Sequence, residues 1–78
     1  MPEKKELRID RKPVNSTNIV SVGYDDPTNT LDVEFYSGTL YRYADVPRNV
    51  YERLISAESV GSFFQQNVKK TFQYKRIV

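Results

Sequence analysis

The chain has 78 residues and a formal net charge of +2, and it contains six Tyr and four Phe but neither Cys nor His. A chain of this length forms one small domain that needs a packed core, because disulfides and the usual zinc ligands are absent. No apolar run approaches the roughly 20 residues that span a bilayer, and the N-terminus lacks the apolar stretch of a secretory signal, so we expect a cytoplasmic protein without membrane association.

The N-terminal residues differ in composition from the rest of the chain. Residues 1–13 carry five basic and three acidic side chains without a clear hydrophobic period. This pattern predicts a flexible basic tail that ends near Pro13, followed by a single domain over residues 14–78.

Two strands are expected next, with a turn between them. Residues 18–24 are rich in β-branched side chains, and the Asp-Asp-Pro-Thr-Asn stretch that follows is typical of a turn. Residues 30–36 alternate between apolar and charged side chains, as a half-buried strand does. Leu31, Val33 and Phe35 form the apolar face, and Asp32 and Glu34 form an acidic outer face.

The turn around Gly38 decides how a third strand pairs with the second, and two registers compete. A two-residue loop would place Tyr41 and Tyr43 on the polar face. A three-residue loop, with Gly38 in the left-handed region, would place both tyrosines on the apolar face and set Asp32 opposite Arg42. We favour the three-residue loop because it pairs opposite charges and keeps each side chain on its proper face. Both tyrosines are then expected in the core.

Two short helices should follow this hairpin. Pro47 suits the first turn of a helix, because the N–H that it lacks would have no partner there. Ser59 is a good N-cap for a second helix along residues 60–70. The expected buried stripes are Val50, Leu54 and Ala57, widened by Tyr51 and Ile55, and then Val60, Phe64 and Val68 with Phe63 alongside.

The order of elements predicts the fold class. Residues 72–78 alternate and are expected to form either an extended segment on the core or a short extra strand. We predict an α+β fold in which a three-stranded antiparallel β-meander has two short helices packed on one face.

The order of these signals resembles the KTSC domain, a short bacterial domain named from the C-terminus of certain lysyl-tRNA synthetases and also found as free-standing small proteins. The matching positions are Ser16, Asn18, Ile19, Val22 to Asp25, Leu31 to Phe35, Gly38, Tyr41 to Tyr43, Val46, Pro47, Val50, Tyr51, Leu54, Ala57, Ser59, Gly61, Phe64, Val68, Phe72, Tyr74 and Ile77. The sequence departs from the family at residues 60–63, where a more polar or aromatic stretch is common. The resemblance implies the fold above, and it implies RNA binding as the function suggested for the family.

Catalysis is not expected from this sequence, and no cofactor or metal is predicted. Without His and Cys, the commonest general base and the strongest nucleophile are missing. The adjacent carboxylates of Asp25 and Asp26 are better explained by the turn at Pro27. Ser59 near Gly61 is better explained as an N-cap than as part of an anion site.

Nucleic-acid binding is the leading functional hypothesis, with a tRNA-like RNA as the partner. Residues 14–68 carry three basic and seven acidic side chains, whereas residues 69–78 carry four basic side chains and no acidic one. The C-terminal segment interleaves these bases with aromatic rings, which could contact phosphates and nucleobases. The candidate binding residues are Arg42, Lys69, Lys70, Tyr74, Lys75 and Arg76.

A protein-interaction module is the alternative. A small sheet with an open edge can recruit a strand of a partner, and this domain would then dock on a larger enzyme or complex. A solvated basic tail is the non-functional explanation of the C-terminal charges. The acidic outer face of Asp32 and Glu34 would repel phosphates, so an RNA site is expected near the ends of the chain.

Overall fold

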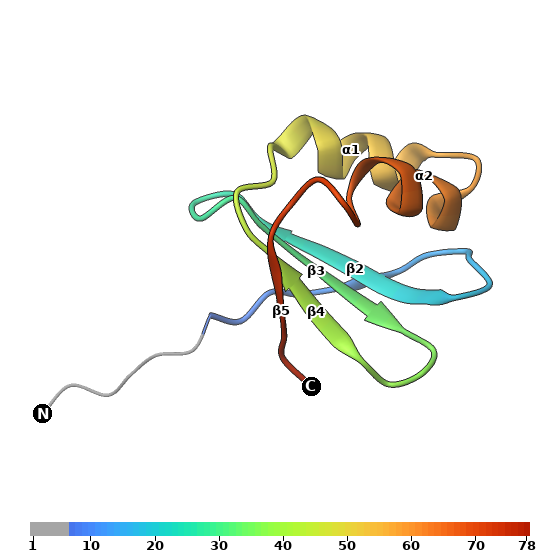
Figure 1. Ribbon diagram of the computed structural model, residues 1–78, viewed down its shortest axis with the longest axis horizontal. Helices are drawn as coiled ribbons and strands as arrows, with labels where there is room; N and C mark the ends of the chain where they lie inside the picture. Colours follow the sequence, from blue (N-terminus) through green and yellow to red (C-terminus); the bar gives the residue numbers. More distant parts are fainter. Residues whose placement is uncertain (1–6) are drawn as a thin grey trace, which may run out of the picture.

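Within residues 7–78, five strands form one antiparallel sheet in the order of the chain, and two helices cover one of its faces (Figure 1). The computed structural model describes residues 7–78. The elements are β1 (Lys12–Pro13), β2 (Ile19–Asp25), β3 (Thr30–Phe35), β4 (Leu40–Tyr43), α1 (Arg48–Ser56), α2 (Val60–Asn67) and β5 (Tyr74–Arg76). The predicted α+β fold is confirmed. The meander of three strands is extended at both edges within residues 7–78: β5, which pairs with β4, is the short extra strand that was one of the two alternatives, whereas β1, which pairs with β2, was not predicted.

The hairpin of β3 and β4 has the predicted three-residue loop. Leu31 pairs with Tyr43 and Asp32 pairs with Arg42 across the two strands. Gly38 has a φ of 91°, which only glycine adopts without strain. This register places the side chains of β4 alternately toward the helices and toward the opposite face.

The core lies between the sheet and the helices and is largely apolar. Tyr43 is only 1% exposed, and Tyr41 is half-buried, so both tyrosines lie on the apolar face as predicted. Ile55, which was expected to widen the apolar stripe of α1, is instead 45% exposed because α1 presents Leu54 to the core. The buried residues of the core are Ile19, Val22, Leu31, Val33, Tyr43, Val46, Leu54, Val60, Phe64 and Val68.

The start of α2 is held against the segment that leads into β2. The Oγ of Ser59 accepts a hydrogen bond of 3.2 Å from the backbone N–H of Ser62, which confirms the predicted N-cap. A Cβ atom on Gly61 would lie 2.8 Å from the Oδ1 atom of Asn18. The small size of Gly61 therefore allows the close approach of α2 to residues 16–18.

Residues 7–11 lie across the face of the sheet that the helices leave uncovered. Ile9 is 9% exposed, and a Cβ atom on Gly23 would lie 2.3 Å from the carbonyl oxygen of Asp10. Residues 7–13 therefore pack on the domain, although the sequence placed them in a tail outside it. Residues 1–6, the rest of the expected flexible tail, lie outside the described residues.

The acidic outer face expected from β3 is neutralised and mostly covered. Asp32 is 1% exposed and accepts two hydrogen bonds from Arg42, of 2.8 and 2.9 Å. Arg42 also donates to the carbonyl oxygen of Leu7 at 3.0 Å. Glu34 accepts a 2.8 Å hydrogen bond from Ser21 and lies 3.7 Å from the Nε of Arg11. The expectation of an exposed carboxylate is wrong for Asp32, because the N-terminal segment folds over this face, whereas the Glu34 side chain remains 34% exposed.

Candidate nucleic-acid interface

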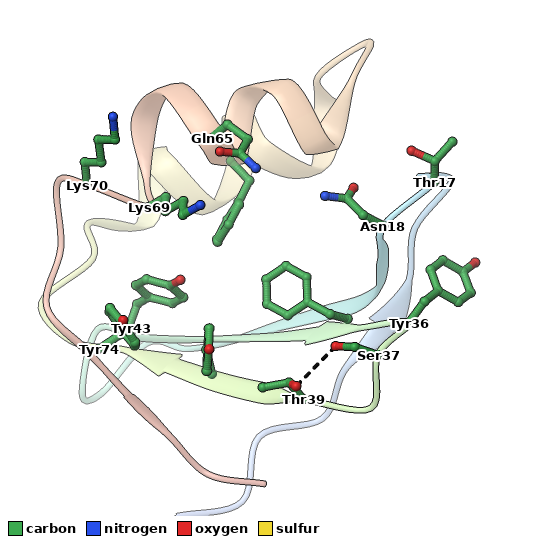
Figure 2. Close-up of a pocket in the computed structure, with 13 residues that line it drawn as sticks. Thr17, Asn18, Tyr36, Ser37, Thr39, Tyr43, Gln65, Lys69, Lys70 and Tyr74 are labelled. Carbon is green, nitrogen blue, oxygen red and sulfur yellow. Dashed lines mark hydrogen bonds between the residues drawn. The ribbon is translucent and has the colours of Figure 1, made fainter.

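A groove of about 560 Å³ runs between the β3–β4 hairpin and α2 (Figure 2). Its base is formed by rings from the sheet and from α2, and its sides come from the loop before β2, the hairpin loop and the segment after α2. A pocket of this size is within the usual range of small-ligand sites. The thirteen lining residues are Thr17, Asn18, Phe35, Tyr36, Ser37, Thr39, Tyr41, Tyr43, Phe64, Gln65, Lys69, Lys70 and Tyr74.

The rings of the groove form one continuous cluster. Phe64 makes edge-to-face contacts with Phe35 and Tyr43, at centroid distances of 5.5 and 5.6 Å. Tyr74 lies 5.0 Å from Tyr41 and 5.4 Å from Tyr43 in tilted geometry. These distances suit favourable aromatic pairing. Exposure to solvent increases along the cluster, from the buried Phe64 to Tyr74, which is 55% exposed.

Two lysines stand at one end of this groove. Lys69 and Lys70 follow α2 directly, and the backbone N–H of Lys69 donates to the carbonyl oxygen of Phe64 at 2.9 Å. Both lysines are exposed, and Figure 2 shows them at the end of the groove where Tyr43 and Tyr74 lie. No Asp or Glu is among the thirteen residues that line the groove. The groove therefore combines positive charge with aromatic surface.

The structure separates the six candidate residues into two groups. Lys69, Lys70 and Tyr74 line the groove together. Arg76 pairs with Tyr41, so its side chain lies on the same face of the sheet as the groove, and its Nε donates to the carbonyl oxygen of Val78 at 3.0 Å.

Arg42 and Lys75 point away from the groove. They pair with each other across β4 and β5, which places both side chains on the face opposite Tyr74. The Arg42 side chain is only 18% exposed and is bound to Asp32, so the structure does not bring it together with the candidate residues of the groove.

Burial alters the acidity of one tyrosine in the groove. Loss of hydration, together with the neighbouring Tyr74 and Tyr41, raises the pKa of Tyr43 to about 12. Tyr43 therefore keeps its proton to a higher pH than an ordinary tyrosine does. It can serve as a hydrogen-bond donor or acceptor at the base of the groove.

Sequence reasoning missed the polar residues of the groove. Asn18 is placed by Ser16, whose Oγ accepts hydrogen bonds of 3.3 Å from the backbone N–H groups of Asn18 and Ile19 and donates to the Asn18 side chain at 3.0 Å. Gln65 is on the exposed side of α2, and its amide lies above the rings in Figure 2. The Ser-x-Asn spacing before a strand was the one local signal, since a serine there commonly forms such a turn.

The acidic pair of the β2–β3 turn has a structural role. The carboxylate of Asp25 accepts hydrogen bonds from the Thr28 backbone N–H at 3.2 Å and from the Thr28 hydroxyl at 2.6 Å. Asp26 forms an ion pair with Arg48 at the start of α1. Within residues 7–78, no group of three His, Cys, Asp or Glu side chains could hold a metal ion. In the same part of the chain, neither helix is long and apolar enough to cross a membrane.

The antiparallel sheet with both helices on one face, and the core between them, define a small α+β domain. Residues 15–72 match the KTSC domain, and the chain belongs to this family. It is similar to a KTSC domain protein from Yersinia pestis of known crystal structure, with a TM-score of 0.88 and 34% identity over 91% of this chain and 100% of that one.

Two kinds of protein have sequences similar to that of this chain. An uncharacterized protein from Stutzerimonas stutzeri is 43% identical over 68 residues, which cover 86% of this chain and 96% of the relative. A lysine–tRNA ligase from Trichormus variabilis is 41% identical over 54 residues, which are 69% of this chain but 10% of the ligase. The domain thus occurs both in proteins of about this size and as a small part of larger ones.

Proposed function

We propose that this domain binds RNA without catalysing a reaction, through the groove between the β3–β4 hairpin and α2. The observation that carries the proposal is the convergence of Lys69, Lys70 and Tyr74 on one aromatic groove whose lining, within residues 7–78, contains no carboxylate. Lysines contribute phosphate contacts and exposed rings stack on bases, and RNA-binding surfaces combine the two. The presence of similar sequence in proteins named lysine–tRNA ligases supports a tRNA-like RNA as the partner.

Recruitment of a partner strand is less well supported by the edges of the sheet. The edge strands have only two residues in β1 and three in β5. Pro13 in β1 lacks the N–H that a pairing strand would need, and β5 carries Lys75 and Arg76. These are features that protect an edge from pairing, so we favour RNA over a protein partner.

The proposal is tested by measuring the binding of fluorescently labelled tRNA as a function of salt, with two matched double variants. K69A/K70A removes the two lysines at the groove. K12A/K75A removes two lysines elsewhere, because Lys12 is in β1 at the opposite edge of the sheet and Lys75 points to the opposite face. Both double variants lower the net charge by the same amount.

We expect wild type and K12A/K75A to bind with similar affinity and K69A/K70A to bind about tenfold more weakly. The salt slope of K69A/K70A should be shallower by about 0.7 for each lysine that contacts a single-stranded phosphate. Equal losses in the two double variants would show attraction by net charge alone and would contradict the groove as the site. Absence of tRNA binding by the wild type would overturn the proposed function.

A further inference from the structure

We infer that the groove holds an unpaired nucleobase, so that the domain selects single-stranded RNA over duplex RNA, with Tyr74 as the stacking ring. This inference rests on the proposed function and deepens it by naming the form of RNA that is bound. It follows from three features of the groove: an exposed aromatic residue, polar side chains along the groove, and positive charge confined to one end.

The first feature is the position of Tyr74. Tyr74 as a residue is 55% exposed, yet its ring is backed by the rings of Tyr41 at 5.0 Å and Tyr43 at 5.4 Å. A ring that is supported on one side and open on the other offers a preorganised surface to a planar base. Such stacking requires a base that has left the helical stack, because paired bases in a duplex have no free face.

The second feature is a set of polar side chains around the rings. Gln65 projects from α2 over the groove and Asn18 stands at the end away from the lysines, as Figure 2 shows. An amide offers both a donor and an acceptor, which is what the hydrogen-bonding edge of a base requires. In duplex RNA these edges are already paired, and the deep, narrow major groove keeps side chains away from them.

The third feature is the difference in charge between the two ends of the groove. Lys69 and Lys70 stand at one end, and Asn18 and Tyr36 stand at the other (Figure 2). In the proposed arrangement the phosphate of a nucleotide lies at the lysines, its base lies against Tyr74, and the edge of the base points along the groove toward Gln65. Tyr36 is 65% exposed and lies where the next base of a single strand would pass.

The test compares a labelled eight-nucleotide single-stranded RNA with the same RNA annealed to its complement, using fluorescence anisotropy. Two substitutions at one position separate stacking from apolar contact. Y74F keeps the ring, and Y74L replaces it with an apolar chain of no aromatic character. Tyr74 is exposed, so neither variant should change the fold, and thermal unfolding followed by circular dichroism verifies this.

We expect the wild type and Y74F to bind the single strand at least tenfold more tightly than the duplex, and Y74L to lose about tenfold in affinity for the single strand. Equal affinity for the two forms, or equal binding by Y74F and Y74L, would overturn this inference while RNA binding itself stands. Failure of both forms to bind, together with failure of tRNA to bind, would overturn the proposed function as well.

A second measurement addresses the role of Gln65. Homopolymers of U, A and C of equal length should bind the wild type with different affinities, and Q65A should reduce these differences while Lys69 and Lys70 keep the salt slope unchanged. Unaltered base preference in Q65A would contradict a role for Gln65 in contacting the base.

Discussion

Asp32 and Arg42 face each other across β3 and β4, and both carboxylate oxygens of Asp32 accept hydrogen bonds from the same guanidinium group. The two side chains are 1% and 18% exposed. Two parallel bonds of this kind hold a charged pair in one geometry. The pair therefore fixes the register of the hairpin as well as neutralising the carboxylate.

Removal of Arg42 should strongly destabilise the domain. R42A leaves the carboxylate of Asp32 buried without its partner, which costs about 3 kcal/mol of the free energy of unfolding. Urea unfolding followed by circular dichroism measures this loss. R48A is the matched control, because Arg48 also pairs with acidic side chains, Asp26 and Glu52, but on the exposed surface. R48A should change stability little, and equal effects in the two variants would contradict the prediction.

Gly23 should be required for the packing of the N-terminal segment. G23A brings a Cβ atom within 2.3 Å of the carbonyl oxygen of Asp10, which is backbone and cannot rotate away. We expect a loss of about 1–3 kcal/mol, typical of overpacking, and faster trypsin cleavage after Arg8 and Arg11.

A second glycine variant is the control for this cleavage. G38A strains a residue with φ of 91°, but nothing lies within 4 Å of the position that its Cβ atom would take, so the new methyl group does not touch residues 7–11. Trypsin should therefore cut G38A after Arg11 at the rate seen for the wild type. Unchanged cleavage in G23A would show that the segment does not depend on this contact.

High pH should destabilise the domain through Tyr43. Its pKa in the folded state is about 12, whereas the phenol in the unfolded chain ionises near its ordinary value of 10.0. Between these values the unfolded chain releases a proton that the folded chain keeps, so the free energy of unfolding falls as pH rises from 10 to 12. Y43F should show a weaker fall over this range, because phenylalanine has no proton to lose.

The ultraviolet absorbance of tyrosinate provides an independent readout of the same group. A titration of the folded wild type should contain a late step near pH 12 that Y43F lacks. Identical titration curves for the two proteins would contradict the assignment of the raised pKa to Tyr43.

Ser59 should stabilise α2 as its N-cap. S59A removes the side-chain oxygen that accepts the N–H of Ser62, and N-cap substitutions of this kind cost about 1 kcal/mol. S62A is the control, since Ser62 contributes only its backbone N–H to the cap. Thermal unfolding should rank the stabilities as wild type and S62A above S59A.

The central hairpin could be predicted from sequence because its structure depends on residues that are close together in the chain. The alternation in residues 30–36 and the position of Gly38 identify the apolar face and the loop without reference to the rest of the chain. The cap at Ser59 could likewise be predicted, since it depends only on the residues at the start of α2.

The cover of the outer face could not be predicted in the same way. Residues 7–11 contain only two apolar side chains and no period, and their position depends on Gly23 and Arg42, which are far away in the sequence. For this reason Asp32 looked exposed from its place in the alternation, although it is buried in the structure.

The candidate site was predictable in part. Lys69, Lys70 and Tyr74 stand out because basic and aromatic residues are concentrated near the C-terminus. Asn18 and Gln65 do not, because their proximity to the ring cluster arises only when α2 packs over the hairpin. Lys75 and Tyr74 lie on opposite faces of the sheet because β5 pairs with β4. Sequence reasoning did not decide whether residues 72–78 form a strand or an extended segment, so it could not assign these faces.

The ring cluster has a consequence for the energetics of this domain. Tyr43 and Phe64 belong both to the buried core and to the wall of the groove. A ligand that occupies the groove must therefore bind the folded chain in preference to the unfolded one, and by mass action it raises the melting temperature as its concentration exceeds its Kd. The increase in the melting temperature of this small domain therefore reports how much of the groove is occupied, and it can be used to rank unlabelled candidate ligands by affinity.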